Sequence, residues 1–147
     1  MPRFVLLLAA LAVAAAASPT SAQTFELLSD NTQTPEFAFD ISGDGRVVIG
    51  RGRGGGAGAA ETWRWEGGTL TYLDRFMEQD VSPGGLSGDG SIIVGSAGLF
   101  NPFAVIWNDG TYASLPLPEG ALSVSVSGVS NDGRVAAGSY RIDPDGD

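Results

Sequence analysis

Three aspartates have the type and spacing to do chemistry, because each stands at the same place in a repeated phrase. Asp44, Asp89 and Asp132 recur at intervals of 45 and 43 residues, a spacing typical of solenoids and propellers. Carboxylates arranged in this way could serve hydrolysis or ligate Ca²⁺. Each is followed by glycine, however, and Asp-Gly favours the two-residue turn of a β-hairpin. We therefore expect three structural turns, built by Ser42, Asp44 and Gly45, by Ser87, Asp89 and Gly90, and by Ser130, Asp132 and Gly133.

A second group of carboxylates follows the third repeat. Asp143, Asp145 and Asp147 alternate around a proline and a glycine, so that a turn could direct several oxygens at one centre, as Ca²⁺ requires. The alternative is an acidic loop between strands, since such loops are rich in the same residues. No cofactor is expected beyond Ca²⁺ at this one candidate site.

Tryptophans are the other candidates for contact with a ligand. Trp65 and Trp107 occupy the same place in successive repeats, which favours packing between strands. Trp63 has Val105 as its counterpart in the next repeat, not an aromatic residue. Trp63 is therefore the side chain that we would expect to stack on a sugar or another ligand.

The composition disfavours several classes of function. The sequence contains no histidine and no cysteine, which removes the commonest general base, thiolate metal sites and disulfides. Ser-His-Asp, Cys-His and zinc chemistry are disfavoured, so we expect a protein that is not an enzyme. The formal net charge of −9 repels nucleic acid phosphates, which leaves a surface glycan or another protein as the expected partner.

Short strands would position these residues. Each Asp-Gly turn is followed by a nearly all-apolar strand, expected to be buried on both faces: Arg46–Ile49, Ser91–Val94 and Arg134–Ala137. A second hairpin follows, with a tryptophan strand, a tight loop that ends in glycine, and a strand that starts with threonine. Four short strands in about 43 residues match the blade of a propeller. We therefore predict an all-β fold of repeated four-stranded antiparallel units, which together form a partial β-propeller-type array.

The repeats occupy about residues 37–80, 81–122 and 123–147, and the third is incomplete. Thr24–Leu28 resembles the last strand of a repeat, and Asp74–Asp80 between the first two repeats fits a helical turn or a loop equally well. An array of this length leaves strand edges open. It is therefore either a fragment of a longer array or a chain that self-associates through these edges.

The start of the chain predicts export. Arg3 lies in a short basic segment, Phe4–Ala17 is apolar, and the small residues Thr20 and Ala22 form a cleavage site. The pattern indicates a signal peptide over residues 1–22, cleaved near Ala22, and a β-repeat domain over residues 23–147. No other stretch of the mature chain is apolar enough to span a membrane. We expect the mature protein in the periplasm, at the cell surface or outside the cell.

The repeated phrase, its tryptophan strand and the Trp-x-x-Gly-Thr motif together resemble the extracellular HAF repeats of bacterial secreted and surface proteins. The resemblance extends from about Ala38 to Ser139. The His-Ala-Phe of that family is replaced by Phe103-Ala104-Val105 in one repeat and by Glu61-Thr62-Trp63 in the other. The resemblance implies a propeller-type array, often within a larger surface or autotransported protein, with no shared catalytic activity.

These features predict a non-enzymatic secreted or cell-surface β-repeat protein that acts as a structural or interaction module. Two alternatives stay open. One is a calcium-supported carbohydrate-binding or adhesion module, and the other is a fragment of a propeller-type hydrolase.

Overall fold

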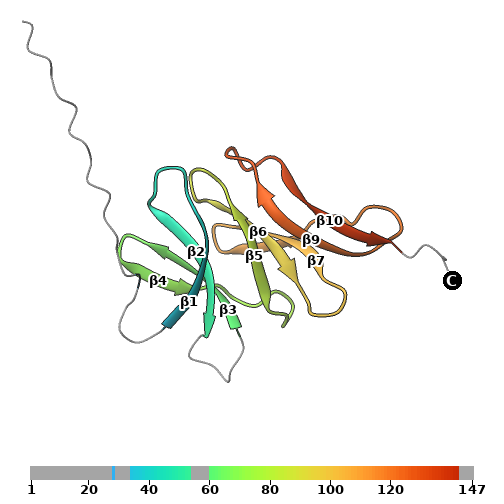
Figure 1. Cartoon of the computed structure of the whole chain (residues 1–147), viewed down its shortest axis with the longest axis horizontal. Coiled ribbons are helices and arrows are strands. Elements are labelled where there is room, and N and C mark those ends of the chain that lie inside the picture. The colour runs from blue at the N-terminus through green and yellow to red at the C-terminus, as the bar shows by residue number, and fades with distance from the viewer. Residues whose placement is uncertain (1–27, 29–33, 54–59, 143–147) are drawn as a thin grey trace, which may run out of the picture.

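The described part of the protein is built from β-strands. The computed structural model describes Leu28, residues 34–53 and residues 60–142, and every regular element within them is a strand (Figure 1). In chain order the strands are β1 (Thr34–Ile41), β2 (Val47–Arg53), β3 (Ala60–Glu66), β4 (Thr69–Tyr72), β5 (Val81–Leu86), β6 (Ile92–Ala97), β7 (Phe103–Asn108), β8 (Thr111–Ser114), β9 (Ala121–Val129) and β10 (Ala136–Ile142). No helix in these residues is long and apolar enough to cross a membrane.

Three sheets follow one another along the chain. β1-β2-β3-β4 form blade 1, β5-β6-β7-β8 form blade 2, and β9 with β10 forms a two-stranded sheet that we call half-blade 3. All neighbouring strands within the sheets are antiparallel. Figure 1 shows the sheets in a row, from blade 1 to half-blade 3. The prediction of an all-β fold with four-stranded antiparallel units is confirmed.

Apolar side chains hold successive sheets together. Residues of β2 and of the segment after β4 pack against residues of β5 and β6, and the buried members are Val47, Ile49, Leu73, Leu86 and Ile93. The next interface is similar, because Val94 and Ala104 of blade 2 pack against Val126 of β9. Full burial of each such aliphatic side chain contributes roughly 1.5–3 kcal/mol relative to exposure. These two clusters therefore lie between sheets, whereas a third, with Val81, Ala97 and Val105, lies on blade 2 itself.

The strand after each Asp-Gly turn differs in burial between the repeats. Val47, Val48 and Ile49 in β2 are all buried, as expected of a strand covered on both faces. Every residue of β10 is exposed, and so are Arg134 and Val135 just before it, so the same expectation for Arg134–Ala137 is wrong. The physical reason is that β10 pairs only with β9 among the described residues, and no further sheet of that part covers it.

The glycine that ends each repeated phrase is required by a close approach of backbone. A Cβ atom at this position would come closer than 3.0 Å to a carbonyl oxygen of the preceding strand: 2.0 Å from Phe37 for Gly50, 2.4 Å from Ser82 for Gly95 and 2.0 Å from Ser125 for Gly138. Real Cβ atoms essentially never come so close. The register of the pair shifts near each of these points, which is the mark of a β-bulge.

The second hairpin of each blade has a two-residue loop. Gly67 and Gly68 join β3 to β4 with φ angles of 57° and 87°, and Asp109 and Gly110 join β7 to β8 with φ angles of 44° and 86°. Two successive positive φ angles define the type I′ turn, whose twist matches that of the flanking strands.

The connection between blades 1 and 2 is a loop and not a helical turn. Phe76 and Gln79 form an isolated antiparallel bridge, and Met77 and Glu78 between them have φ angles of 49° and 60°. Of the two interpretations of Asp74–Asp80, the loop is therefore the right one.

Several predictions fall on residues outside the described ranges. They are the signal peptide over residues 1–22, the strand-like segment Thr24–Leu28 apart from Leu28, and the acidic residues Asp143, Asp145 and Asp147.

Candidate functional site

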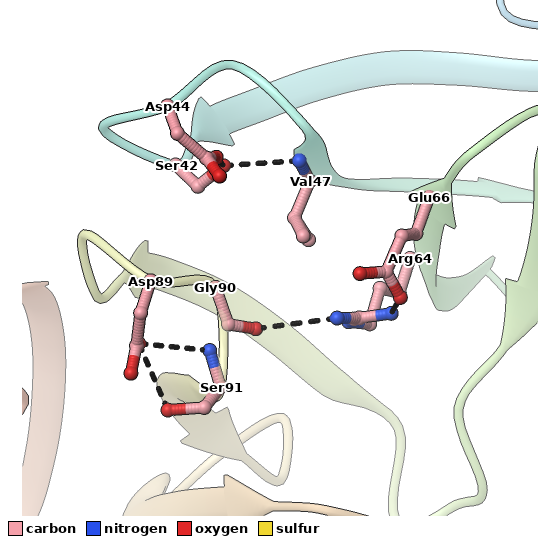
Figure 2. Close-up of polar contacts among 8 residues, drawn as sticks. All are labelled: Ser42, Asp44, Val47, Arg64, Glu66, Asp89, Gly90 and Ser91. Atoms are coloured by element: carbon pink, nitrogen blue, oxygen red, sulfur yellow. Dashed lines mark hydrogen bonds and ion pairs between the residues drawn. The ribbon is translucent and has the colours of Figure 1, made fainter.

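The first serine–aspartate turn is closed by hydrogen bonds within the repeated phrase. Figure 2 shows Ser42 beside Asp44, where the Ser42 hydroxyl donates to Oδ1 of Asp44 at 2.8 Å. The same oxygen accepts the backbone N–H of Arg46 at 3.0 Å. The Ser42 hydroxyl also accepts the backbone N–H of Val47 at 2.9 Å. Serine thus joins the aspartate to the start of β2.

The other two turns repeat this arrangement. The serine-to-aspartate bond measures 2.7 Å from Ser87 to Asp89 and 2.6 Å from Ser130 to Asp132. In both, the aspartate Oδ1 also accepts the backbone N–H of the residue two positions later, at 3.1 Å and 3.2 Å. The second turn has one bond more, because the Ser91 hydroxyl donates to Asp89 at 2.9 Å. All three candidate carboxylates are therefore engaged inside their own turns.

The turn type differs from the predicted two-residue turn. A two-residue type I′ turn needs positive φ at both central residues, but here only the glycines have it, at 74° in Gly45, 76° in Gly90 and 72° in Gly133. The Ser42 backbone N–H donates to the Val47 carbonyl at 2.8 Å, so four residues separate the paired positions. The aspartate keeps a negative φ because its side chain accepts the backbone N–H two residues ahead, as in an Asx turn.

These hydrogen bonds favour the ionised carboxylates. The pKa of Asp89 is lowered to about 2, first by the Ser87 hydroxyl and then by the Ser91 backbone and hydroxyl. The pKa of Asp44 is lowered mainly by the backbone N–H of Arg46, and that of Asp132 mainly by the Ser130 hydroxyl. A carboxylate that stays ionised at neutral pH cannot deliver a proton as a general acid.

The turns are also linked to one another. The backbone N–H of Gly43 donates to the carbonyl of Gly88 at 2.8 Å, and the N–H of Gly88 donates to the carbonyl of Asn131 at 2.9 Å. Each donor and acceptor is the residue between the serine and the aspartate of its phrase. We call this series the turn row. Figure 2 shows its first two members, the Asp44 and Asp89 turns, one above the other.

Arg64 makes a further contact between the blades. Its Nη1 pairs with Oε2 of Glu66 at 2.6 Å and lowers the pKa of that carboxyl, and its Nη2 lies 3.5 Å from the Gly90 carbonyl oxygen (Figure 2). The Arg64 side chain is 20% exposed. It therefore joins β3 of blade 1 to the turn of blade 2.

Other polar groups between the blades were missed by the sequence analysis. The Thr62 hydroxyl donates to the Val81 carbonyl at 2.6 Å, and the backbone N–H of Leu86 donates to Asp40 at 2.8 Å. One signal was available, because Thr62 and Arg64 share a strand face on which the second repeat has Ala104 and Ile106. Polar residues at positions that are apolar in the next repeat indicate a local partner.

Trp63 does not offer its ring to a ligand, which corrects the sequence expectation. Its side chain is 1% exposed, and it lies across from Gly50 on β2, where a Cβ atom would meet the indole ring at 2.1 Å. The indole ring thus fills the space that a side chain at residue 50 would occupy. Trp107 packs against the core between blades 1 and 2.

The calcium prediction stays a prediction. Among the described residues there is no group of three acidic side chains that could hold a metal ion. Asp44, Asp89 and Asp132 lie in three separate turns, and Asp143, Asp145 and Asp147 are outside the described ranges.

Comparison with known proteins bears on the fold. No protein-family model and no curated protein matches the chain. The crystal structure of TolB from Acinetobacter baumannii matches with a TM-score of 0.53 and 13% sequence identity, over 77% of this chain and 27% of the TolB chain. The chain thus spans about a quarter of the length of that structure. Because the TolB structure is propeller-like, the match confirms the partial β-propeller-type array.

Proposed function

We propose that this chain is a structural and interaction module of propeller type in an exported bacterial protein, with no catalytic activity of its own. The observation that carries the proposal is the turn row. All three candidate carboxylates accept hydrogen bonds inside equivalent turns, and these turns bind each sheet to the next. We infer that these carboxylates recur because they hold the turns and link the sheets, and not because they catalyse a reaction.

The chemistry of the carboxylates supports the same conclusion. A hydrolase that uses paired carboxylates needs one of them protonated as the acid. The pKa of Asp44, Asp89 and Asp132 is lowered in each case, so none is suited to that role. The sequence also lacks histidine, which is the usual alternative general acid or base.

An activity measurement tests this proposal. The purified chain and its Asp89→Asn variant are incubated with chromogenic glycosides, esters and phosphates, and we expect no rate above that of buffer from either. Asparagine keeps an oxygen that can accept the bonds from Ser87 and Ser91, so the variant should stay folded. A hydrolysis that disappears in Asp89→Asn while the variant stays folded at the assay temperature would contradict the proposal.

Export and relationship to the extracellular HAF repeats belong to the same proposal. Both are supported by sequence, through the basic and apolar start of the chain and the threefold phrase. Expression in a bacterium followed by mass spectrometry of the exported fraction should give a chain that starts at Gln23. Ala22→Asp, which alters the last residue before the cleavage site, should prevent this processing. Recovery of the intact Met1 form from the cytoplasm alone would contradict export.

A further inference from the structure

An apolar cavity of about 210 Å³ lies between blade 2 and half-blade 3. Its lining includes Ala104 and Leu115 from blade 2, and Val124, Val126 and Ala136 from β9 and β10. The remaining wall consists of proline, alanine and glycine residues together with Ser139 and Tyr140 of β10. The surface therefore has the chemistry of an interior without a covering layer among the described residues.

The matching place between blades 1 and 2 is filled. There, Trp107 of β7 and Tyr112 of β8 pack against the cluster that contains Val47, Ile49 and Leu73. Leu73 and Leu115 are equivalent residues, because each donates its backbone N–H to the third strand of its own blade, to Thr62 and to Ala104, both at 2.8 Å. Leu73 thus belongs to a cluster that an aromatic pair from the next blade covers, whereas Leu115 borders the cavity.

The edge of β10, which lies beside the cavity, also lacks a partner among the described residues. Gly50 of β2 pairs with Trp63 of β3, and Gly95 of β6 pairs with Val105 of β7. Gly138 of β10 is the third member of this series. Within residues 34–53 and 60–142, β10 pairs with a strand on one side only, which is β9. Figure 1 shows β10 in the last sheet of the row.

We propose that the open edge of β10 and the cavity beside it take up a β-hairpin of the β7–β8 kind from a separate partner polypeptide. The repeated register specifies its chemistry. Because Gly95 faces Val105 and Ile93 faces Trp107, the hairpin places an apolar residue opposite Gly138 and a tryptophan opposite Ala136. A tyrosine on its second strand, equivalent to Tyr112, completes the filling of the cavity.

This occupant follows from continuity with the interface between blades 1 and 2. A second copy of the chain is a poorer candidate, since its own β3–β4 and β7–β8 hairpins are already paired within their sheets and would have to leave them. The inference deepens the proposed function and rests on the chain being an interaction module.

A peptide experiment tests the inference. The probe is a synthetic peptide with the sequence of residues 102–115, added to the full chain, and backbone hydrogen exchange in β10 is followed by NMR. We expect exchange in Ala136–Ile142 to slow at least tenfold, because the added strand supplies partners for the open edge. The control peptide carries V105S and W107A and should leave the exchange unchanged.

Two variants of the chain locate the binding. Leu115→Arg puts a charge into the cavity and should weaken peptide binding at least tenfold, whereas Leu117→Arg, close by and outside the cavity lining, should bind as the natural chain does. If Leu115→Arg fails to fold, the comparison of the two peptides on the unaltered chain still tests the inference.

Three results would overturn the inference: no protection of β10, equal protection by both peptides, or protection without peptide that rises with chain concentration through dimer formation. None of them bears on the absence of catalysis, which the activity measurement with Asp89→Asn tests separately.

Discussion

At the scale of residues, the serine of each phrase is as important to the hydrogen bonding of the turn as the aspartate is. The Ser87 hydroxyl donates to Asp89 and accepts the backbone N–H of Ile92 at 2.9 Å. Ser87 is 1% exposed, so water cannot readily replace it as the acceptor for Ile92. Asp89 orients the hydroxyl, and the hydroxyl fixes the first residue of β6. The spacing Ser-x-Asp is therefore set by two coupled hydrogen bonds.

Removal of the buried hydroxyl should be costly. Ser87→Ala leaves the Ile92 N–H without its acceptor, and we expect a loss of about 1–3 kcal/mol in the free energy of unfolding. Ser91→Ala is the matched control, because it removes a hydroxyl that bonds to the same Asp89 oxygen from an exposed position. It should cost about 0.5 kcal/mol or less. Urea unfolding measures both, and equal losses would contradict the role assigned to Ser87.

The same turns predict how stability depends on pH. Asp89 has a folded-state pKa of about 2 against an ordinary value of 3.8, so its ionised form stabilises the fold above about pH 4 and that contribution disappears as the pH falls toward about 2. Asp44 and Asp132 act in the same direction. We expect the urea midpoint to fall over this range, and to fall less steeply in Asp89→Asn. An unchanged slope in the variant would show that the Asp89 carboxylate does not contribute.

At the scale of elements, one dipeptide forms two different turns. Asp109-Gly110 makes a two-residue turn, whereas Asp44-Gly45 lies in a four-residue loop. The difference is the residue two positions before the aspartate, which is Trp107 in the first case and Ser42 in the second. The Ser42 hydroxyl donates to the carboxylate and accepts from the next strand at once, whereas the Trp107 indole can only donate, so the whole phrase sets the turn type.

Two equivalent glycines separate backbone strain from packing. Gly45 and Gly90 have φ angles of 74° and 76°, but a Cβ atom on Gly45 meets nothing within 4 Å, whereas one on Gly90 would lie 2.6 Å from Val47. We expect Gly45→Ala to cost about 1–2 kcal/mol through the left-handed φ alone. Gly90→Ala should cost about 1–3 kcal/mol more through overpacking. Thermal unfolding of both variants tests this, and equal losses would place the whole effect in the backbone.

The fold was more accessible from the sequence than the environments of individual side chains. The recurrence of Asp44, Asp89 and Asp132 and the short apolar runs are local patterns, so they predicted the antiparallel units correctly. Burial of Trp63 depends on its pairing with Gly50 across two strands, and exposure of β10 depends on which sheets surround it. Both are properties of the assembled molecule, which no local pattern contains.

At the scale of the whole molecule, each sheet contacts its neighbours in the row, as in other repeat proteins whose stability is roughly a sum of units and interfaces. The polar contacts of Thr62, Arg64 and Asp40 are particular to the first interface. The apolar contacts and the turn row recur in both interfaces. The array thus combines a repeated framework with local variation.

Calcium should leave this framework unchanged. Asp44, Asp89 and Asp132 lie in three separate turns and each already accepts a serine hydrogen bond there, so we expect millimolar Ca²⁺ not to raise the melting temperature through them. Isothermal titration calorimetry gives a second readout, with no heat above dilution expected. A rise in melting temperature that is lost in Asp145→Asn would instead support the calcium-dependent adhesion alternative, through Asp143, Asp145 and Asp147.

The turn row has a direction, because each N–H donor belongs to an earlier blade and each carbonyl acceptor to a later one. Gly88 in the middle turn therefore does both: its carbonyl accepts from the turn before it and its N–H donates to the turn after it. A duplicated unit of about 43 residues inserted between two blades could form the same hydrogen bonds to the turns on either side. Duplication of a unit would lengthen such a protein by a whole blade, and deletion of a unit would shorten it, without change to the neighbouring turns.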